Sequence, residues 1–272
     1  MATVVMVSLP PTVPDGAALE GLLKQACEAA AWRPAFYRQL LDSHILVIVA
    51  DETLAQNVAR PDRVHFVQWK RVDGTAAIPF FSSARTFFEA VPHGAKCLVL
   101  ETRQLLELTR GAILHLNPYS EFNLQVMPSD VEAILASRFL VVPESFALET
   151  DRQVSFRQVV DPPFPLLDAL TLLYSQLPQV HGAYVALVKG LYDDAPESLL
   201  LGLDIEGDPE PVVRDSGLVI RDTYHGPYNL DIVHLKSGER GLLSYGFEPA
   251  FRFFDRRMAA VLAAPAVTSS AQ

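Results

Sequence analysis

The first half of the chain alternates helical and strand-like patterns of apolar residues at short intervals. Between residues 15 and 32, apolar positions recur at the spacing of one helix face. A second, shorter helix is predicted after Pro34, and residues 44–49 form the continuous apolar run of a strand buried on both faces. Further strands, each followed by a helical pattern, are predicted at residues 78–81, 97–100 and 113–116. The alternation predicts a mixture of α and β structure.

The second half of the chain follows a less regular stretch, in which Asp161-Pro162-Pro163 interrupts any periodic structure. Leucines at helical spacing then predict a helix up to Leu177. Apolar runs predict strands at residues 182–188, 198–203, 229–235 and 241–245. A last helix is predicted from Pro249, because proline suits the first helical position, and it would bury Phe251, Phe254, Met258 and Leu262.

These patterns predict an α+β (mixed α/β) protein of two domains, each with a small mixed or antiparallel sheet packed with helices. The length of 272 residues is enough for two domains with separate cores. We expect an N-terminal domain over residues 1–145 and a C-terminal domain over residues 165–265. The linker would span residues 146–164, and residues 266–272 would form a flexible tail.

Charge and termini limit the classes of partner. The chain has 22 Lys and Arg against 32 Asp and Glu, a net charge of −10, so we expect no nucleic-acid partner, which would require clustered basic residues. The apolar start, residues 1–9, lacks the basic residues of a secretory signal and is expected to form a short strand. No apolar stretch approaches the roughly 20 residues that cross a bilayer, so we expect no membrane partner. Together with only two cysteines, these features predict a cytoplasmic protein.

Signatures of catalysis are absent from the sequence. It has no glycine-rich phosphate loop, no nucleophile elbow and no His-Glu-x-x-His motif. Cys27 and Cys97 are both expected to be buried in cores and unreactive. None of the seven histidines lies at metal-ligand spacing from another histidine or a cysteine. We therefore expect no cofactor and no metal site.

One acidic run resembles the early part of a calcium loop. Asp204, Glu206, Asp208 and Glu210 alternate with other residues, but the glycine and glutamate that such a loop needs are replaced by Pro209 and Asp215. The pattern favours a strand that runs into an exposed acidic turn, and cation binding by residues 204–210 stays open.

Two loop segments are richer in aromatic and polar residues than a plain connection requires. They span residues 116–122 and 221–229. Because Tyr, Arg and His are typical of interfaces, these loops provide candidate interaction residues: Asn117, Tyr119, Phe122, Arg221, Tyr224, His225 and Tyr228. The alternatives are that Asn117-Pro118 only makes a tight turn and that Tyr224 packs on the sheet edge.

Several stretches resemble a known family. In residues 31–41, Ala-Trp-Arg-Pro-Ala-Phe-Tyr-Arg-Gln-Leu-Leu, a helix leads into the next strand. Residues 78–83, Ile-Pro-Phe-Phe-Ser-Ser, are similar to a strand-to-helix step in which Ser82 replaces the usual Thr, and residues 116–120, Leu-Asn-Pro-Tyr-Ser, precede a final helix around Ile134. Residues 165–257, with an aromatic helix at 251–254, resemble the C-terminal domain of the same family.

The family that these stretches resemble is the enhanced serine sensitivity protein family, SseB. The resemblance covers nearly the whole chain and implies the N-terminal and C-terminal SseB domains. It implies no established reaction and no agreed catalytic residues.

The leading hypothesis is therefore a non-catalytic cytoplasmic binding or regulatory protein with a protein partner or self-association. The alternative is an enzyme whose site is assembled from distant loop carboxylates and hydroxyls. The sequence indicates no particular small-molecule ligand.

Overall fold

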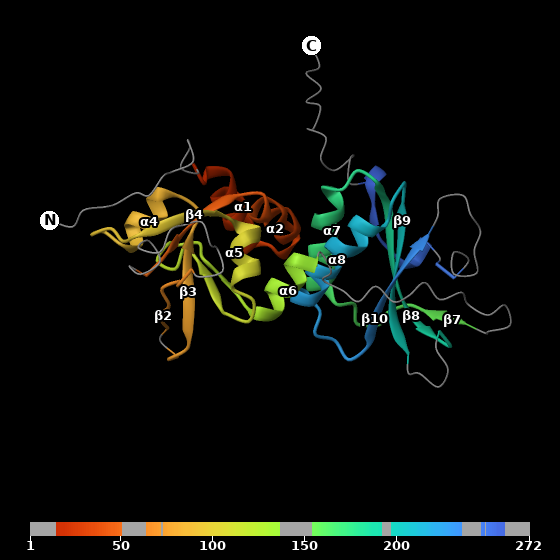
Figure 1. Cartoon of the computed structure of the whole chain (residues 1–272). Coiled ribbons are helices and arrows are strands. Elements are labelled where there is room, and N and C mark those ends of the chain that lie inside the picture. Colours follow the sequence, from red (N-terminus) through yellow and green to blue (C-terminus); the bar gives the residue numbers. More distant parts are fainter. Residues whose placement is uncertain are drawn as a thin grey trace, which may run out of the picture. The chain divides into compact units, whose positions relative to one another are not determined.

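The computed structural model describes residues 15–50, 64–71, 73–136, 154–191, 197–235, 246–247 and 249–258. The chain divides into two compact units, residues 1–139 and 140–272, which are described one at a time (Figure 1). Each unit contains a mixed sheet and helices, so the predicted α+β class is confirmed. The strands expected at residues 1–9 and 241–245 and the tail at 266–272 lie outside the described residues.

The sheet of the first unit has the strand order β4-β1-β3-β5-β6, and β2 pairs with β3. β3 and β5 are parallel, whereas the other pairs are antiparallel. The interior strand β1, between β4 and β3, is buried on both faces, as predicted, with Ile45 and Val47 fully covered. The strands are β1 His44–Ile48, β2 Trp69–Lys70, β3 Ala76–Phe81, β4 Cys97–Glu101, β5 Leu114–Leu116 and β6 Leu124–Val126.

Helices cover both faces of this sheet. α4 packs on one face through a cluster that includes Phe81 and Phe87, and Figure 1 shows α1, α2 and α5 on the other face. Ser83 caps α4, since its hydroxyl accepts a hydrogen bond from the Thr86 N–H. The helices are α1 Ala17–Glu28, the 3-10 helix η1 Ala30–Trp32, α2 Arg33–Leu41, α4 Ala84–Ala90, α5 Thr102–Leu108 and α6 Pro128–Ala136.

The two cysteines lie less deep than the sequence pattern predicted. The buried stripe of α1 consists of Leu19, Leu23 and Ala26, and this stripe is too narrow to include Cys27, which is exposed. Cys97 is half-buried because β4 is an edge strand of the sheet. Burial nevertheless raises the pKa of both thiols, so the unreactive protonated form dominates at neutral pH.

The sheet of the second unit has the strand order β10-β9-β8-β11, and β7 pairs with β8. β9 and β10 are parallel, whereas the other pairs are antiparallel. The helix α8 lies between β9 and β10 in sequence and makes the crossover that a parallel pair requires. The elements are β7 Ser155–Arg157, α7 Phe164–Ser175, β8 Val180–Lys189, β9 Ser198–Ile205, α8 Glu210–Thr223, β10 Asn229–Leu235, the 3-10 helix η3 Pro249–Phe251 and β11 Arg252–Asp255.

The structure differs from the sequence-based description of this unit at three places. Residues 155–157, assigned to the linker, form β7, whose Phe156 packs against Phe247 with ring centroids 5.3 Å apart. α8 was not predicted, because prolines flank its start and its glycine weakens a helical pattern. The predicted last helix is wrong: β11 pairs with β8 and buries Phe254, whereas Met258 is exposed.

A buried polar pair fixes α7 against α8. The hydroxyl oxygens of Tyr174 and Ser216 lie 3.0 Å apart, and the Ser216 hydroxyl donates to the Val212 carbonyl at 2.7 Å. The Arg256 guanidinium donates to the carbonyls of Leu177 and Val180, next to the end of α7. The same guanidinium also donates to the Tyr174 carbonyl in the last turn of α7, where carbonyls lack the N–H partner that a continuing helix would supply.

The acidic run extends from β9 into the start of α8. Glu206 is exposed and pairs with His181 at 3.0 Å, and the Asp208 carboxylate accepts a hydrogen bond from the Glu210 N–H at 3.0 Å. Among the described residues, no group of three or more His, Cys, Asp or Glu side chains is placed to hold a metal ion. None of the helices in the described part of the chain has the length and apolar character to span a bilayer.

Candidate functional site

A buried polar cluster lies where β3 passes into α4. Ser82 and Ser83 follow the strand directly and are 1% and 4% exposed. Asn117, which follows β5, accepts a hydrogen bond from the Ser82 N–H at 3.0 Å and donates to the Ser82 hydroxyl oxygen at 2.9 Å. The parallel pairing of β3 and β5 brings the ends of these two strands together.

Glu20 on α1 joins this cluster. Its Oε1 accepts hydrogen bonds from the hydroxyls of Ser82 at 2.8 Å and Ser83 at 2.7 Å, and its other oxygen pairs with Arg85. Burial alone would raise the pKa of the Glu20 carboxyl, but the hydrogen bonds from Ser83, Ser82 and Arg85 hold this pKa below its usual value. Glu20 is therefore ionised at neutral pH and is a weak base.

Gly16 brings the start of α1 close to the two serines. Its φ of 68° lies in the left-handed region, and an added Cβ would lie 2.7 Å from both the Ser82 carbonyl oxygen and the Ser83 Cβ. Only glycine allows this approach without a shift of the backbone. The contact places Glu20, one turn into α1, within reach of the serine hydroxyls.

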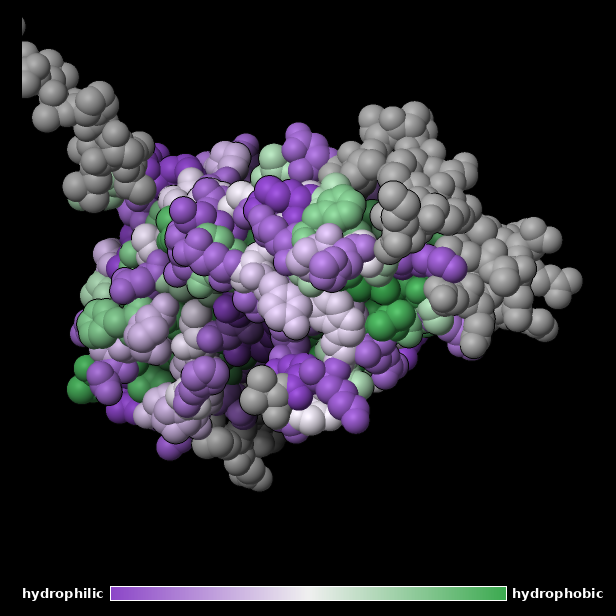
Figure 2. All heavy atoms as spheres, turned by 90° about the vertical axis from the view of Figure 1, so that its left-hand side faces the viewer, coloured by the Kyte–Doolittle hydropathy of each residue, from purple (hydrophilic) through white to green (hydrophobic). Residues whose placement is uncertain are grey.

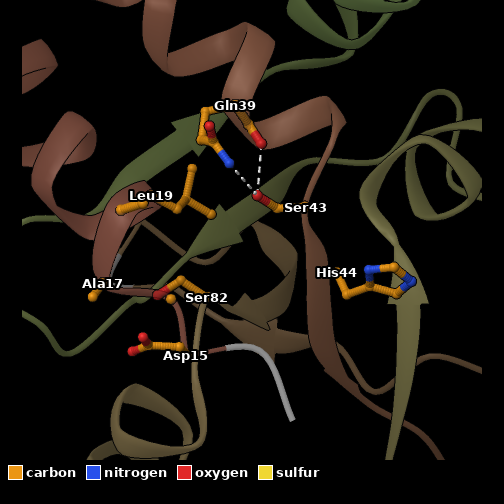
Figure 3. A pocket seen from close by; sticks show the side chains of 9 residues that line it. Asp15, Ala17, Leu19, Gln39, Ser43, His44 and Ser82 are labelled. Atoms are coloured by element: carbon orange, nitrogen blue, oxygen red, sulfur yellow. Dashed lines mark hydrogen bonds between the residues drawn. The ribbon is translucent and has the colours of Figure 1, made fainter. Parts of the chain in front are cut away.

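An open cavity of about 260 Å³ adjoins the cluster. Figure 3 shows Ser82 beside Ala17 at the start of α1, with Gln39 and Ser43 hydrogen-bonded to each other on another side. The cavity is smaller than the roughly 300–1,000 Å³ typical of sites for drug-sized ligands. Its lining residues are Asp15, Gly16, Ala17, Ala18, Leu19, Gln39, Ser43, His44 and Ser82.

The three candidate residues of the first loop differ in their exposure to solvent. Asn117 is 1% exposed and belongs to the polar cluster. Tyr119 is 71% exposed, and its ring lies 5.6 Å from that of Trp69 on β2. Phe122 is half-buried, with the Lys24 ammonium 5.6 Å from its ring centroid. The loop therefore combines one buried polar anchor with one exposed aromatic side chain.

The four candidates in the second unit surround the connection between α8 and β10. Arg221 lies in the last turn of α8, and the Tyr224 hydroxyl donates to the Tyr228 carbonyl at 3.0 Å. His225 is exposed, and Tyr228 is 37% exposed. These residues form a local turn in one unit, and the Asn117 loop belongs to the other unit.

The side of the first unit that faces the viewer in Figure 2 is mainly hydrophilic. It carries a recess with a hydrophilic floor, and hydrophobic side chains appear around it in separate groups. A partner that bound this side would meet hydrophobic and polar groups together, as is usual for non-obligate interfaces.

Sequence reasoning identified Asn117 and Tyr119 but not Glu20, Trp69 or the Ser82–Asn117 contact. Glu20 lies in a helix whose pattern indicates only its apolar face. Its partners Ser82 and Ser83 are 62 and 63 residues away in the sequence. The Ser82-Ser83 pair is the one local signal, and by itself it indicates only the start of a helix.

Two family models match the chain in succession. Residues 19–133 match the SseB protein N-terminal domain, and residues 148–256 match the SseB protein C-terminal domain. The chain belongs to the SseB family. The resemblance noted in the sequence is thus confirmed, and Glu20, Ser82 and Asn117 all lie within the N-terminal domain match.

Curated relatives support the same assignment. Protein SseB of Escherichia coli (strain K12) is 31% identical over 241 residues, which cover 88% of this chain and 92% of the relative. Protein SseB of Shigella flexneri matches with the same identity and coverage. No solved structure gives a significant match. The names of these relatives state neither a reaction nor a ligand.

Proposed function

We propose that this SseB-family protein is a non-catalytic binding or regulatory protein of the cytoplasm, which engages a protein partner through Tyr119. The observation that carries this proposal is the placement of the Tyr119 ring, which is 71% exposed and rests on Trp69 at 5.6 Å. An exposed aromatic ring that already packs against a neighbouring ring loses little conformational freedom on binding. Such tyrosines are frequent energetic centres of interfaces.

Further aromatic contacts connect Trp69, the neighbour of Tyr119, to the core. Trp69 contacts the buried Phe81 with ring centroids 6.1 Å apart, and Phe81 contacts Phe87 at 5.4 Å. Both Phe81 and Phe87 belong to the cluster between α4 and the sheet. The Tyr119 ring is therefore the outer member of a series of aromatic contacts that reaches the core.

The polar cluster supports a binding role over the enzyme alternative. The Ser82 proton is directed at Glu20, and the Ser82 oxygen accepts a hydrogen bond from Asn117. Because the pKa of Glu20 is lowered, this carboxylate is poorly suited to take a proton from the serine. Burial raises the pKa of both free thiols, so they too are poor nucleophiles at neutral pH.

Affinity capture of the tagged full-length protein from its native host tests this proposal. We expect the wild-type protein to retain a partner in stoichiometric amount and the Tyr119→Ala variant to lose it. Phe164→Ala is the matched control, because Phe164 is also an exposed aromatic residue, at 61%, but lies in the second unit. Phe164→Ala should keep the partner.

Two results would contradict the proposal. One is the absence of any stoichiometric partner across several growth and salt conditions. The other is capture of the same partner by wild type and Tyr119→Ala in equal amounts.

A further inference from the structure

The backbone at Asn117 is unusual for a residue other than glycine. Among the described residues it is the only such residue with a positive φ, at 50°. Asparagine tolerates this left-handed region better than most residues, but Pro118 further restricts the backbone before it. A specific interaction is therefore needed to hold the conformation, and the two hydrogen bonds with Ser82 supply it.

The main chain of Asn117 starts the turn that carries Tyr119. Its N–H donates to the Phe80 carbonyl at 2.9 Å, and its carbonyl accepts from the Ser120 N–H at 3.0 Å. The latter bond closes a four-residue turn in which Tyr119 is the third residue. The backbone conformation of Asn117 thus determines whether the Tyr119 ring contacts the Trp69 ring.

We infer that Asn117 is a positioning residue for the partner-binding site, which it controls through the Tyr119 turn. Asn117 itself is 1% exposed, so it cannot form an extensive contact with a partner. Its side chain anchors one end of the turn to Ser82, and Ser82 in turn is held by Glu20 on α1. This inference rests on the proposed function for its biological role, but the positioning itself can be measured without a partner.

Fluorine NMR of the full chain labelled with fluorotryptophan measures the positioning. The chain has two tryptophans, Trp32 and Trp69, and Trp32→Phe assigns their resonances. Tyr119→Ala gives the Trp69 resonance in the absence of the neighbouring ring. The test variant is Asn117→Gly, because glycine adopts a positive φ without strain and lacks the side chain that bonds to Ser82.

We expect Asn117→Gly to shift the Trp69 resonance toward its position in Tyr119→Ala and to leave the Trp32 resonance in place. The control is Thr102→Ala, which removes another buried hydroxyl of the same unit, one that donates to the Ser43 carbonyl at 2.9 Å. Thr102→Ala should lower stability without moving the Trp69 resonance. An unchanged Trp69 resonance in Asn117→Gly would overturn the inference.

The capture experiment provides a second readout. Asn117→Gly should lose the partner as Tyr119→Ala does, whereas Thr102→Ala should keep it. Full capture by Asn117→Gly would overturn the role of Asn117 in binding. If Tyr119→Ala itself keeps the partner, the proposed function fails, and the NMR result still decides whether Asn117 positions the turn.

Discussion

Glu20 accepts a hydrogen bond from Ser83 at 2.7 Å, although 63 residues separate them in the sequence. The same carboxylate oxygen accepts from Ser82, so one acidic side chain of α1 binds both residues that join β3 to α4. This relationship fixes the start of α1 against the sheet. It also links α1, through Ser82, to the turn that presents Tyr119.

Replacing Glu20 with Gln should destabilise the first unit by about 1–3 kcal/mol, because the amide loses the pairing with Arg85 and leaves the buried serine hydroxyls with a weaker acceptor. Urea unfolding measures this change. Glu89→Gln is the control, since Glu89 also pairs with Arg85 but is exposed, and it should change stability by less than about 0.5 kcal/mol. Equal losses of stability in the two variants would contradict the stabilising role of Glu20.

The stabilisation by Glu20 should depend on pH. The folded-state pKa of Glu20 lies below its ordinary value of 4.5, so the contribution is fully present above that pH. It is lost as the pH falls through the lowered folded-state pKa. The difference in unfolding free energy between wild type and Glu20→Gln should therefore be largest at neutral pH and shrink in acid. A difference that stayed constant into strong acid would be inconsistent with an ionised Glu20.

Replacing Gly16 and Gly21 with alanine should change the stability of the protein in opposite directions. At Gly16 the added Cβ would meet the Ser82 carbonyl and the Ser83 Cβ at 2.7 Å, and φ is 68°, so we expect a loss of about 1–3 kcal/mol. Gly21 lies within α1 and has open space, so Gly21→Ala should stabilise the protein by about 0.5–1 kcal/mol. Thermal unfolding of both variants tests this, and destabilisation by Gly21→Ala would be the unexpected result.

Substitutions at the two members of the buried pair Tyr174 and Ser216 should cost different amounts of stability. Ser216→Ala leaves the Tyr174 hydroxyl buried without its acceptor, and we expect a loss of about 1–3 kcal/mol. Tyr174→Phe should cost less, because the Ser216 hydroxyl keeps its bond to the Val212 carbonyl. In the double variant, the cost should be smaller than the sum of the single costs. Additive costs measured by urea unfolding would indicate that the two hydroxyls do not interact.

Elements with strong local patterns were predictable from the sequence. The apolar run at residues 44–49 predicts β1, because a strand buried on both faces is continuously apolar. The leucines before Ser175 predict α7, because a helix buried along one stripe has apolar residues at helical spacing. α8 was missed because Pro209, Pro211 and Gly217 resemble loop residues. The last helix was predicted wrongly, because pairing with β8 outweighs the local preference of residues 252–255.

The candidate site was only partly visible in the sequence. Asn117 and Tyr119 could be selected, because asparagine before proline and an aromatic residue in a loop are local signals. Their partners Ser82 and Trp69 come from other strands, and pairing between distant strands leaves no periodic signal. The predicted burial of Cys27 is wrong, because the width of a buried helix face depends on what packs against it.

The affinity of the captured, purified partner for wild type and for Tyr119→Ala is the most direct test of the central claim. Isothermal titration calorimetry should show binding by the variant that is weaker by about 2 kcal/mol or more, which corresponds to about thirtyfold in Kd. Phe164→Ala should bind as the wild type does. Equal affinities for wild type and Tyr119→Ala would contradict the account.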